Sequence, residues 1–63
     1  MNDVTRLYNK MLVTLEKGIN DLEKFEDGNM SAGTRVRKTM QTVKELAQKT
    51  RVAVQEQKNA VAN

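Results

Sequence analysis

The chain has 63 residues, with 11 basic against 8 acidic side chains and a net charge of +3. A chain this short forms one domain at most, close to the size at which a single core barely offsets the entropy lost on folding. It contains no cysteine and no histidine, which excludes disulfides and thiolate metal sites and removes the most common general base.

The first predicted element is a helix over residues 2–27. This stretch lacks proline and is rich in residues that favour helix. Its apolar residues recur at alternating steps of four and three, which is typical of helices that pack along a heptad seam. The predicted seam consists of Val4, Tyr8, Met11, Leu15, Gly18, Leu22 and Phe25.

A turn is predicted at residues 28–29. Glycine is the usual residue just past a helix C-terminus, and asparagine is a good N-cap for the next helix. Gly28 and Asn29 fit these two roles in order. Two helices joined by so short a loop run antiparallel.

The second predicted helix covers residues 30–61. Its seam has the same rhythm and consists of Val36, Met40, Val43, Ala47, Thr50, Val54, Gln57 and Val61. The chain is therefore predicted to be all-α, a single domain over residues 1–63 folded as a coiled-coil-like antiparallel hairpin. A turn near residue 29 pairs Phe25 with Gly33 and Gly18 with Met40, so that large residues meet small ones.

Apolar residues beside the seams predict self-association. Leu7, Leu12, Ile19 and Leu46 flank the two seams and stay partly wet in a hairpin that buries one face of each helix. A homodimer in the form of a four-helix bundle would cover them.

Charge is unevenly divided between the two helices. Residues 1–27 hold four basic and six acidic residues, a net charge of −2, whereas residues 28–63 hold seven and two, a net charge of +5. Arg37, Lys44, Arg51 and Lys58 recur every seven residues, with Gln41, Gln48 and Gln55 between them. This row covers about 32 Å of helix, close to the roughly 34 Å of one turn of duplex DNA.

Two interpretations of the basic helix are open from spacing alone. Arginine and lysine in such a row suit the phosphates of double-stranded DNA, with glutamine adding hydrogen bonds; otherwise the row is a solvated flank. The residues predicted to bind DNA are Arg35, Arg37, Lys38, Lys44, Lys49, Arg51 and Lys58. An alternative function is a helical protein–protein interaction module that does not bind nucleic acid. Attraction to anionic lipid is less favoured because the chain lacks tryptophan and a one-sided hydrophobic wedge.

No pattern predicts enzymatic activity, a cofactor, a metal or a small-molecule substrate. The glycines stand alone rather than in a phosphate-binding loop, and the carboxylates lack the spacing of a calcium loop. No run of about 18 apolar residues predicts a membrane span. The polar N-terminus is unlike a secretory signal, so we expect a cytoplasmic protein.

The segment from Glu26 to Lys38 resembles the bacterial linker-histone-like family, the chlamydial-type histone-like proteins. The similarity is carried by Gly28-Asn29, Ala32-Gly33 and Arg35-Val36-Arg37. It implies non-specific DNA binding, nucleoid association and chromosome condensation, with the basic role on Arg35, Arg37 and Lys38. Chlamydial members carry a Lys/Ala-rich tail that is not found here, so the resemblance implies a short member without that tail.

Overall fold

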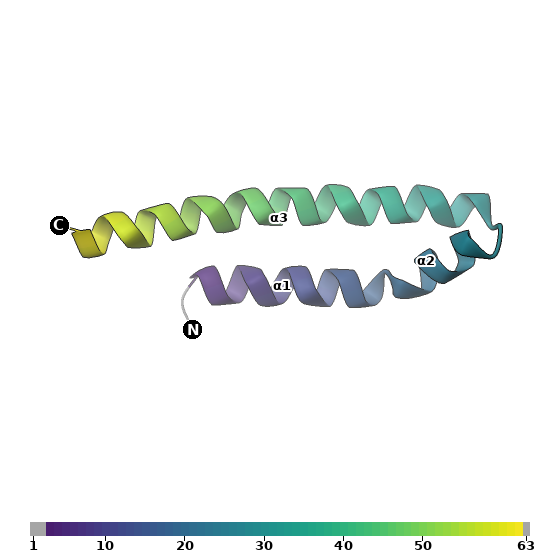
Figure 1. Cartoon of the computed structure of the whole chain (residues 1–63), viewed down its shortest axis with the longest axis horizontal. Coiled ribbons are helices and arrows are strands. Elements are labelled where there is room, and N and C mark those ends of the chain that lie inside the picture. The colour runs from purple at the N-terminus through teal and green to yellow at the C-terminus, as the bar shows by residue number, and fades with distance from the viewer. Residues whose placement is uncertain (1–2, 63) are drawn as a thin grey trace.

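The computed structural model describes residues 3–62, and this part of the chain consists of three helices and no strand. The helices are α1 (Asp3–Lys17), α2 (Ile19–Glu26) and α3 (Met30–Ala62). The chain turns back after α2, so that α3 lies alongside α2 and α1 and the two ends of the chain lie at the same end of the molecule (Figure 1). The predicted all-helical class is confirmed. The predicted start at Asn2 lies outside the described residues.

The predicted first helix is divided at Gly18. Its amide bonds the Leu15 carbonyl three residues back at 3.1 Å, a 3₁₀-type bond, before the α pattern resumes with Leu22 N–H donating to Gly18 O. A β-carbon at Gly18 would lie 3.2 Å from Thr39 Cγ2. Glycine is a common cause of a helix bend, and here it also lets α3 approach closely. The bend between α1 and α2 is visible in Figure 1.

The turn is closed by backbone hydrogen bonds. Gly28 adopts a φ of +100°, a region in which only glycine is free of strain. The Asn29 amide donates to the Lys24 carbonyl at 2.9 Å, and the Gly28 amide to the Phe25 carbonyl at 3.0 Å. These are the two bonds of a Schellman motif, so the chain reverses with the carbonyls of Lys24 and Phe25 paired.

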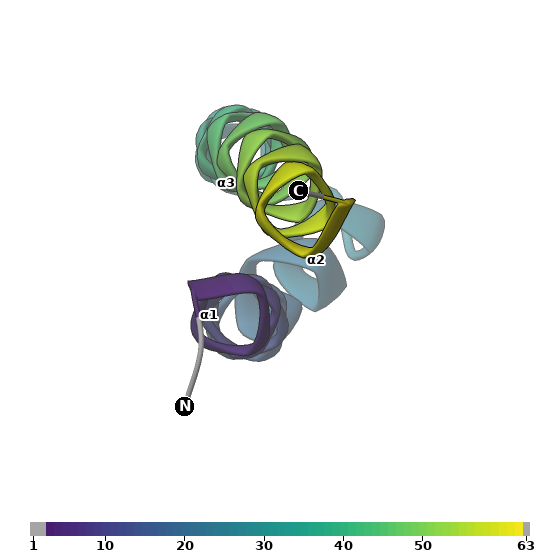
Figure 2. The same cartoon turned by 90° about the vertical axis from the view of Figure 1, so that its left-hand side faces the viewer.

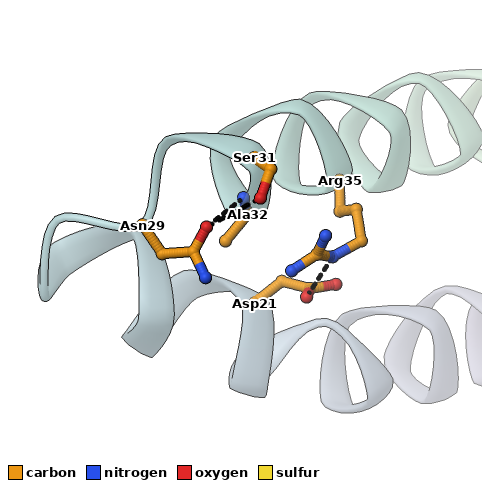
Figure 3. Close-up of polar contacts among 5 residues, drawn as sticks. All are labelled: Asp21, Asn29, Ser31, Ala32 and Arg35. Atoms are coloured by element: carbon orange, nitrogen blue, oxygen red, sulfur yellow. Dashed lines mark hydrogen bonds and ion pairs between the residues drawn. The ribbon is translucent and has the colours of Figure 1, made fainter.

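Asn29 caps α3. Its Oδ1 accepts hydrogen bonds from the Ala32 amide at 3.2 Å and from the Ser31 hydroxyl at 2.8 Å (Figure 3). Capping the free amides of a first turn is worth about 1 kcal/mol. The residues that resemble the histone-like turn therefore build the start of the long basic helix.

The contact between the helices has a different register from the one predicted. In the described residues, only Leu7, Ala32 and Leu46 are buried. The half-buried residues of α1 and α2 extend the row from Leu7. They are Val4, Met11, Thr14, Gly18 and Asp21. The predicted seam positions Tyr8, Leu15 and Leu22 are instead largely exposed, so that part of the prediction is wrong.

The apolar surface of the first two helices is wider than one neighbouring helix can cover, which explains the error. α3 packs on the edge that begins with the apolar Leu7 and Met11 and continues with the smaller or polar residues Thr14, Gly18 and Asp21. The hydroxyls of Thr14 and Thr50 bond carbonyls of their own helices, at 2.8 and 2.7 Å, so they lie in the seam without an unpaired donor. The predicted pair of Phe25 and Gly33 is confirmed, because a β-carbon at Gly33 would lie 2.8 Å from the Phe25 ring.

The hairpin consequently has two unlike sides. The apolar side carries exposed apolar residues from α1 and α2 and from α3: Tyr8, Leu12, Leu15, Ile19, Leu22, Met40, Val54 and Val61. The polar side has a shallow hollow lined by Thr14, Asp21, Arg35, Lys38, Thr39 and Thr42. None of the described helices is long and apolar enough to cross a bilayer.

Candidate nucleic-acid interface

The row Arg37, Lys44, Arg51 and Lys58, called the basic stripe below, lies on the unbroken helix α3. All four side chains are exposed. They lie outside the centre of the contact with α1 and α2, which runs through Ala32, Thr39 and Leu46. At its two ends the stripe borders that contact, because Arg37 lines a hollow with Phe25 and Lys58 lines one with Val4. The stripe spans about 32 Å at 1.5 Å per residue. A rigid helix therefore holds four cations in a line about one DNA turn long.

The basic stripe is not neutralised within the chain. In residues 3–62 the ion pairs are Arg6 with Asp3, at 3.4 Å, and Arg35 with Asp21, at 2.7 Å. None of the four stripe residues belongs to either pair. Unpaired exposed cations on one face keep their full attraction for a polyanion.

Two of the three glutamines between the cations bond to their own helix. The Gln41 amide donates to Glu45 Oε1 at 3.4 Å, and the Gln55 amide donates to Asn59 Oδ1 at 3.0 Å. Glu45 therefore lies next to the stripe, although no acid lies within it. Gln48 makes no hydrogen bond of this kind, which leaves its amide available to a phosphate or a sugar.

Arg35 differs from the stripe. Its Nε donates to Asp21 Oδ1 across the hairpin at 2.7 Å (Figure 3). The Arg35 side chain remains 46% exposed, so this bond ties α3 to α2 while part of the guanidinium stays open to solvent. An exposed pair of this kind contributes roughly 0–1 kcal/mol to stability. Lys38 and Lys49 are exposed, and Lys38 lines the same hollow as Arg35.

The seven residues predicted to bind DNA are thus divided between two surfaces. Four form the basic stripe, while Arg35, Lys38 and Lys49 belong to the polar side or its border. Viewed along the molecule, α1 lies to one side of α3 (Figure 2), so the surface of α3 that faces away from α1 is not covered by the described residues. Their role in binding stays a prediction.

A row of cations on α1 and α2 was not among the predicted site residues. Lys10, Lys17 and Lys24 also recur every seven residues and are exposed. They are one helical turn from Thr14 and Asp21, which line the polar-side hollow. The heptad spacing of these lysines was the available indication, and the net charge of −2 over residues 1–27 concealed it.

Chemistry other than binding has no support in the described residues. Within residues 3–62, no three acidic side chains are grouped closely enough to hold a metal ion. Among the described residues, those that are buried are all hydrophobic. The surface is suited to contact with a charged macromolecule.

The fold and surface thus define a small helical protein whose longest helix, α3, presents a line of exposed cations that form no ion pair within the described residues. A family model described as histone H1-like protein Hc1 matches residues 5–60. The chain belongs to this histone H1-like family, which is a structural, DNA-binding family and not an enzymatic one. No curated protein and no solved structure matches the chain. The histone-like resemblance inferred from the turn and the Arg-Val-Arg segment is confirmed.

Proposed function

We propose that this protein binds double-stranded DNA without sequence specificity, as a nucleoid-associated homodimer of antiparallel, coiled-coil-like hairpins, and contacts phosphates through the basic stripe of α3. The observation that carries the proposal is the stripe itself, four exposed cations on one helix with no ion pair among the described residues. Membership of the histone H1-like family supports DNA as the partner of this stripe. Lys and Arg contacts to phosphates position a protein on DNA but carry no base information.

The surface favours phosphate contacts over base reading. Tyr8 and Phe25 are the two aromatic residues of the chain. Phe25 packs against Gly33, and Tyr8 lies exposed on the apolar side. The two rings lie 17 residues apart in the chain, and Phe25 lines a hollow with Arg37. They do not form the row of neighbouring stacking platforms that binding of single strands uses. Binding of this kind is strongly weakened by salt because it is driven by the release of condensed counterions.

The basic stripe is favoured over the lysine row of α1 and α2 by the charge around it. Residues 1–27 carry a net charge of −2, whereas residues 28–63 carry +5. Acidic neighbours therefore reduce the attraction of Lys10, Lys17 and Lys24 for a polyanion, and the bend at Gly18 interrupts their line. Arg35, Lys38 and Lys49 add contacts at the border of the polar side.

The test compares two triple variants that lose the same charge. One is Lys44→Gln/Arg51→Gln/Lys58→Gln, and the matched control is Lys10→Gln/Lys17→Gln/Lys24→Gln. Binding to random duplex DNA is measured by fluorescence anisotropy, with helicity checked by circular dichroism. The stripe variant should lose most of the affinity and the control little of it. Equal losses would show that net charge rather than the stripe determines binding.

A further inference from the structure

The apolar side of the hairpin lacks a covering layer. Leu12 and Ile19 are 48% and 49% exposed, and a groove between the helices is lined by apolar residues that include Leu15, Leu22 and Met40. The Cα trace measures 53 × 17 × 10 Å, which is the thickness of a single layer of helices. Domains are built from two or more packed layers around a core. The hairpin thus supplies one of the two layers that a packed domain needs.

The chain exposes more surface than a compact monomer of its mass, and the excess is about what one further layer of helices would cover. The chain has 5153 Å² of accessible surface, whereas a compact monomer of its 7.2 kDa mass exposes about 4100 Å². The excess is close to the roughly 800 Å² that each partner contributes to an interface of standard size. A partner of the same length as this hairpin would bury that excess.

The two edges of the apolar side carry opposite charge. On α3, the apolar row of Met40, Val54 and Val61 is bordered by the basic stripe. On α1 and α2, the apolar row is bordered by Glu16 and Glu23, which lie one turn from Leu12 and Ile19 on the outer surface. A surface with one basic and one acidic edge is complementary to a second copy of itself.

Two symmetric ways of stacking two copies on this side differ in their electrostatics. If α3 lies over α3, two basic stripes oppose each other, and this repulsion disfavours the dimer. If α1 and α2 of one copy lie over α3 of the other, each acidic edge meets a basic edge. We infer that a second copy docks on the apolar side in the latter way, giving a four-helix bundle in which every neighbouring pair of helices is antiparallel. This arrangement deepens the proposed homodimer and does not depend on DNA binding.

The register of the hairpin then decides which cations face acids. Phe25 lies level with Gly33 and Gly18 with Thr39, and a two-fold axis parallel to the helices keeps these heights. Glu23 of one copy therefore comes beside Arg37 of the other, and Glu16 beside Lys44. Asp3 and Glu56 lie near the height of Arg51 and Lys58 and line a hollow with Ala53 and Gln57. Both are on the polar side of the hairpin, because Glu56 follows Arg35 and Thr42 at heptad spacing, so neither faces the second copy. The dimer thus leaves Arg51 and Lys58 as the open half of the basic stripe.

The first test removes apolar area from one side of the hairpin. The variant Leu12→Gln/Ile19→Gln changes two residues of the apolar side, and the matched control Val13→Gln/Val52→Gln changes two that are each 46% exposed elsewhere. Sedimentation equilibrium at micromolar concentration should give a dimer for the natural chain and the control. The apolar-side variant should raise the dimer Kd by at least about 100-fold. A monomeric natural chain, or equal effects of the two variants, would overturn the arrangement.

The second test reverses charges on exposed residues and so spares the fold. Glu16→Lys/Glu23→Lys and Arg37→Glu/Lys44→Glu should each weaken the dimer, and the combination should restore it, because the exchanged edges are again complementary. If the reversal on α3 alone strengthens the dimer, α3 lies over α3 and the inference is wrong. A combination no better than the weaker parent would also contradict it. These assays contain no DNA, so they stand apart from the test of DNA binding.

Discussion

The two halves of the basic stripe are expected to contribute unequally to DNA binding. Arg51→Gln/Lys58→Gln removes two exposed cations that face no acid in the proposed dimer. Arg37→Gln/Lys44→Gln removes two that lie beside Glu23 and Glu16 of the second copy. Both variants lose the same charge from the same helix, so a difference between them reports the arrangement of the dimer rather than net charge.

The size of the difference follows from counterion release. Each phosphate neutralised on duplex DNA adds about 0.9 to the slope of log K against log salt. Replacing Arg51 and Lys58 should therefore lower the magnitude of the slope by about 1.8, which makes the affinity loss between about 50 and 200 mM salt smaller by about 12-fold. The Arg37/Lys44 variant should change the slope by well under half as much.

The assay is anisotropy of a labelled random duplex of about three helical turns, titrated at several salt concentrations. Helicity measured on the same samples guards against unfolding. Equal changes of slope for the two variants would refute the unequal division of the stripe and, with it, the pairing of Arg37 and Lys44 with acids. An unchanged slope for both would refute the stripe as a DNA-binding surface.

Three further predictions concern the hairpin itself and are checked by thermal unfolding followed by circular dichroism. Asn29→Ala removes the cap of α3 and should destabilise the fold by about 1 kcal/mol; an unchanged Tm would show that the cap bonds to Ala32 and Ser31 do not matter. Gly28→Ala forces a side chain into the positive-φ conformation and should cost about 1–3 kcal/mol, with Gly28→Asn costing less; equal Tm values for both variants and the natural chain would contradict this. Gly33→Ala places a β-carbon 2.8 Å from the Phe25 ring and should destabilise despite the better helix propensity of alanine, whereas adding Phe25→Leu should restore stability; a stabilising Gly33→Ala would show that the ring moves freely.

The helices and the turn were predictable because local chemistry determines them. Gly28 and Asn29 perform the two tasks that their residue types suggest, a positive-φ C-terminus and an N-cap. The long second helix contains no proline and one glycine, so nothing interrupts it from Met30 to Ala62. The opposition of Phe25 and Gly33 followed from the position of the turn alone.

The register of the seam was not predictable from apolar periodicity. The first two helices carry two neighbouring apolar rows with the same heptad rhythm, and Leu15 and Leu22 are more apolar than Thr14 and Asp21. The structure buries Thr14 and Asp21 more deeply than Leu15 and Leu22. Close approach to α3 needs small side chains, and Asp21 bonds Arg35 at 2.7 Å. Contacts between the helices determine which row packs against α3, whereas apolar periodicity describes only one helix at a time.

The basic stripe was predictable because it depends on spacing along a single helix. Its freedom from intrachain ion pairs was not, since it depends on which acids the turn brings near. Asp21 lies near enough to bond Arg35, while Arg37 stays without an acidic partner in the described chain. The row of Lys10, Lys17 and Lys24 was not predicted, because the net charge of −2 over residues 1–27 conceals cations that share one face of the helix.

The most direct test of phosphate-driven DNA binding is a salt titration of the natural chain with several duplexes of unrelated sequence. The account predicts a straight line of log K against log salt with a slope between about −2 and −6, for two to seven phosphate contacts, and the same affinity for every duplex. A slope near zero, or affinities that differ more than about tenfold between sequences, would contradict it.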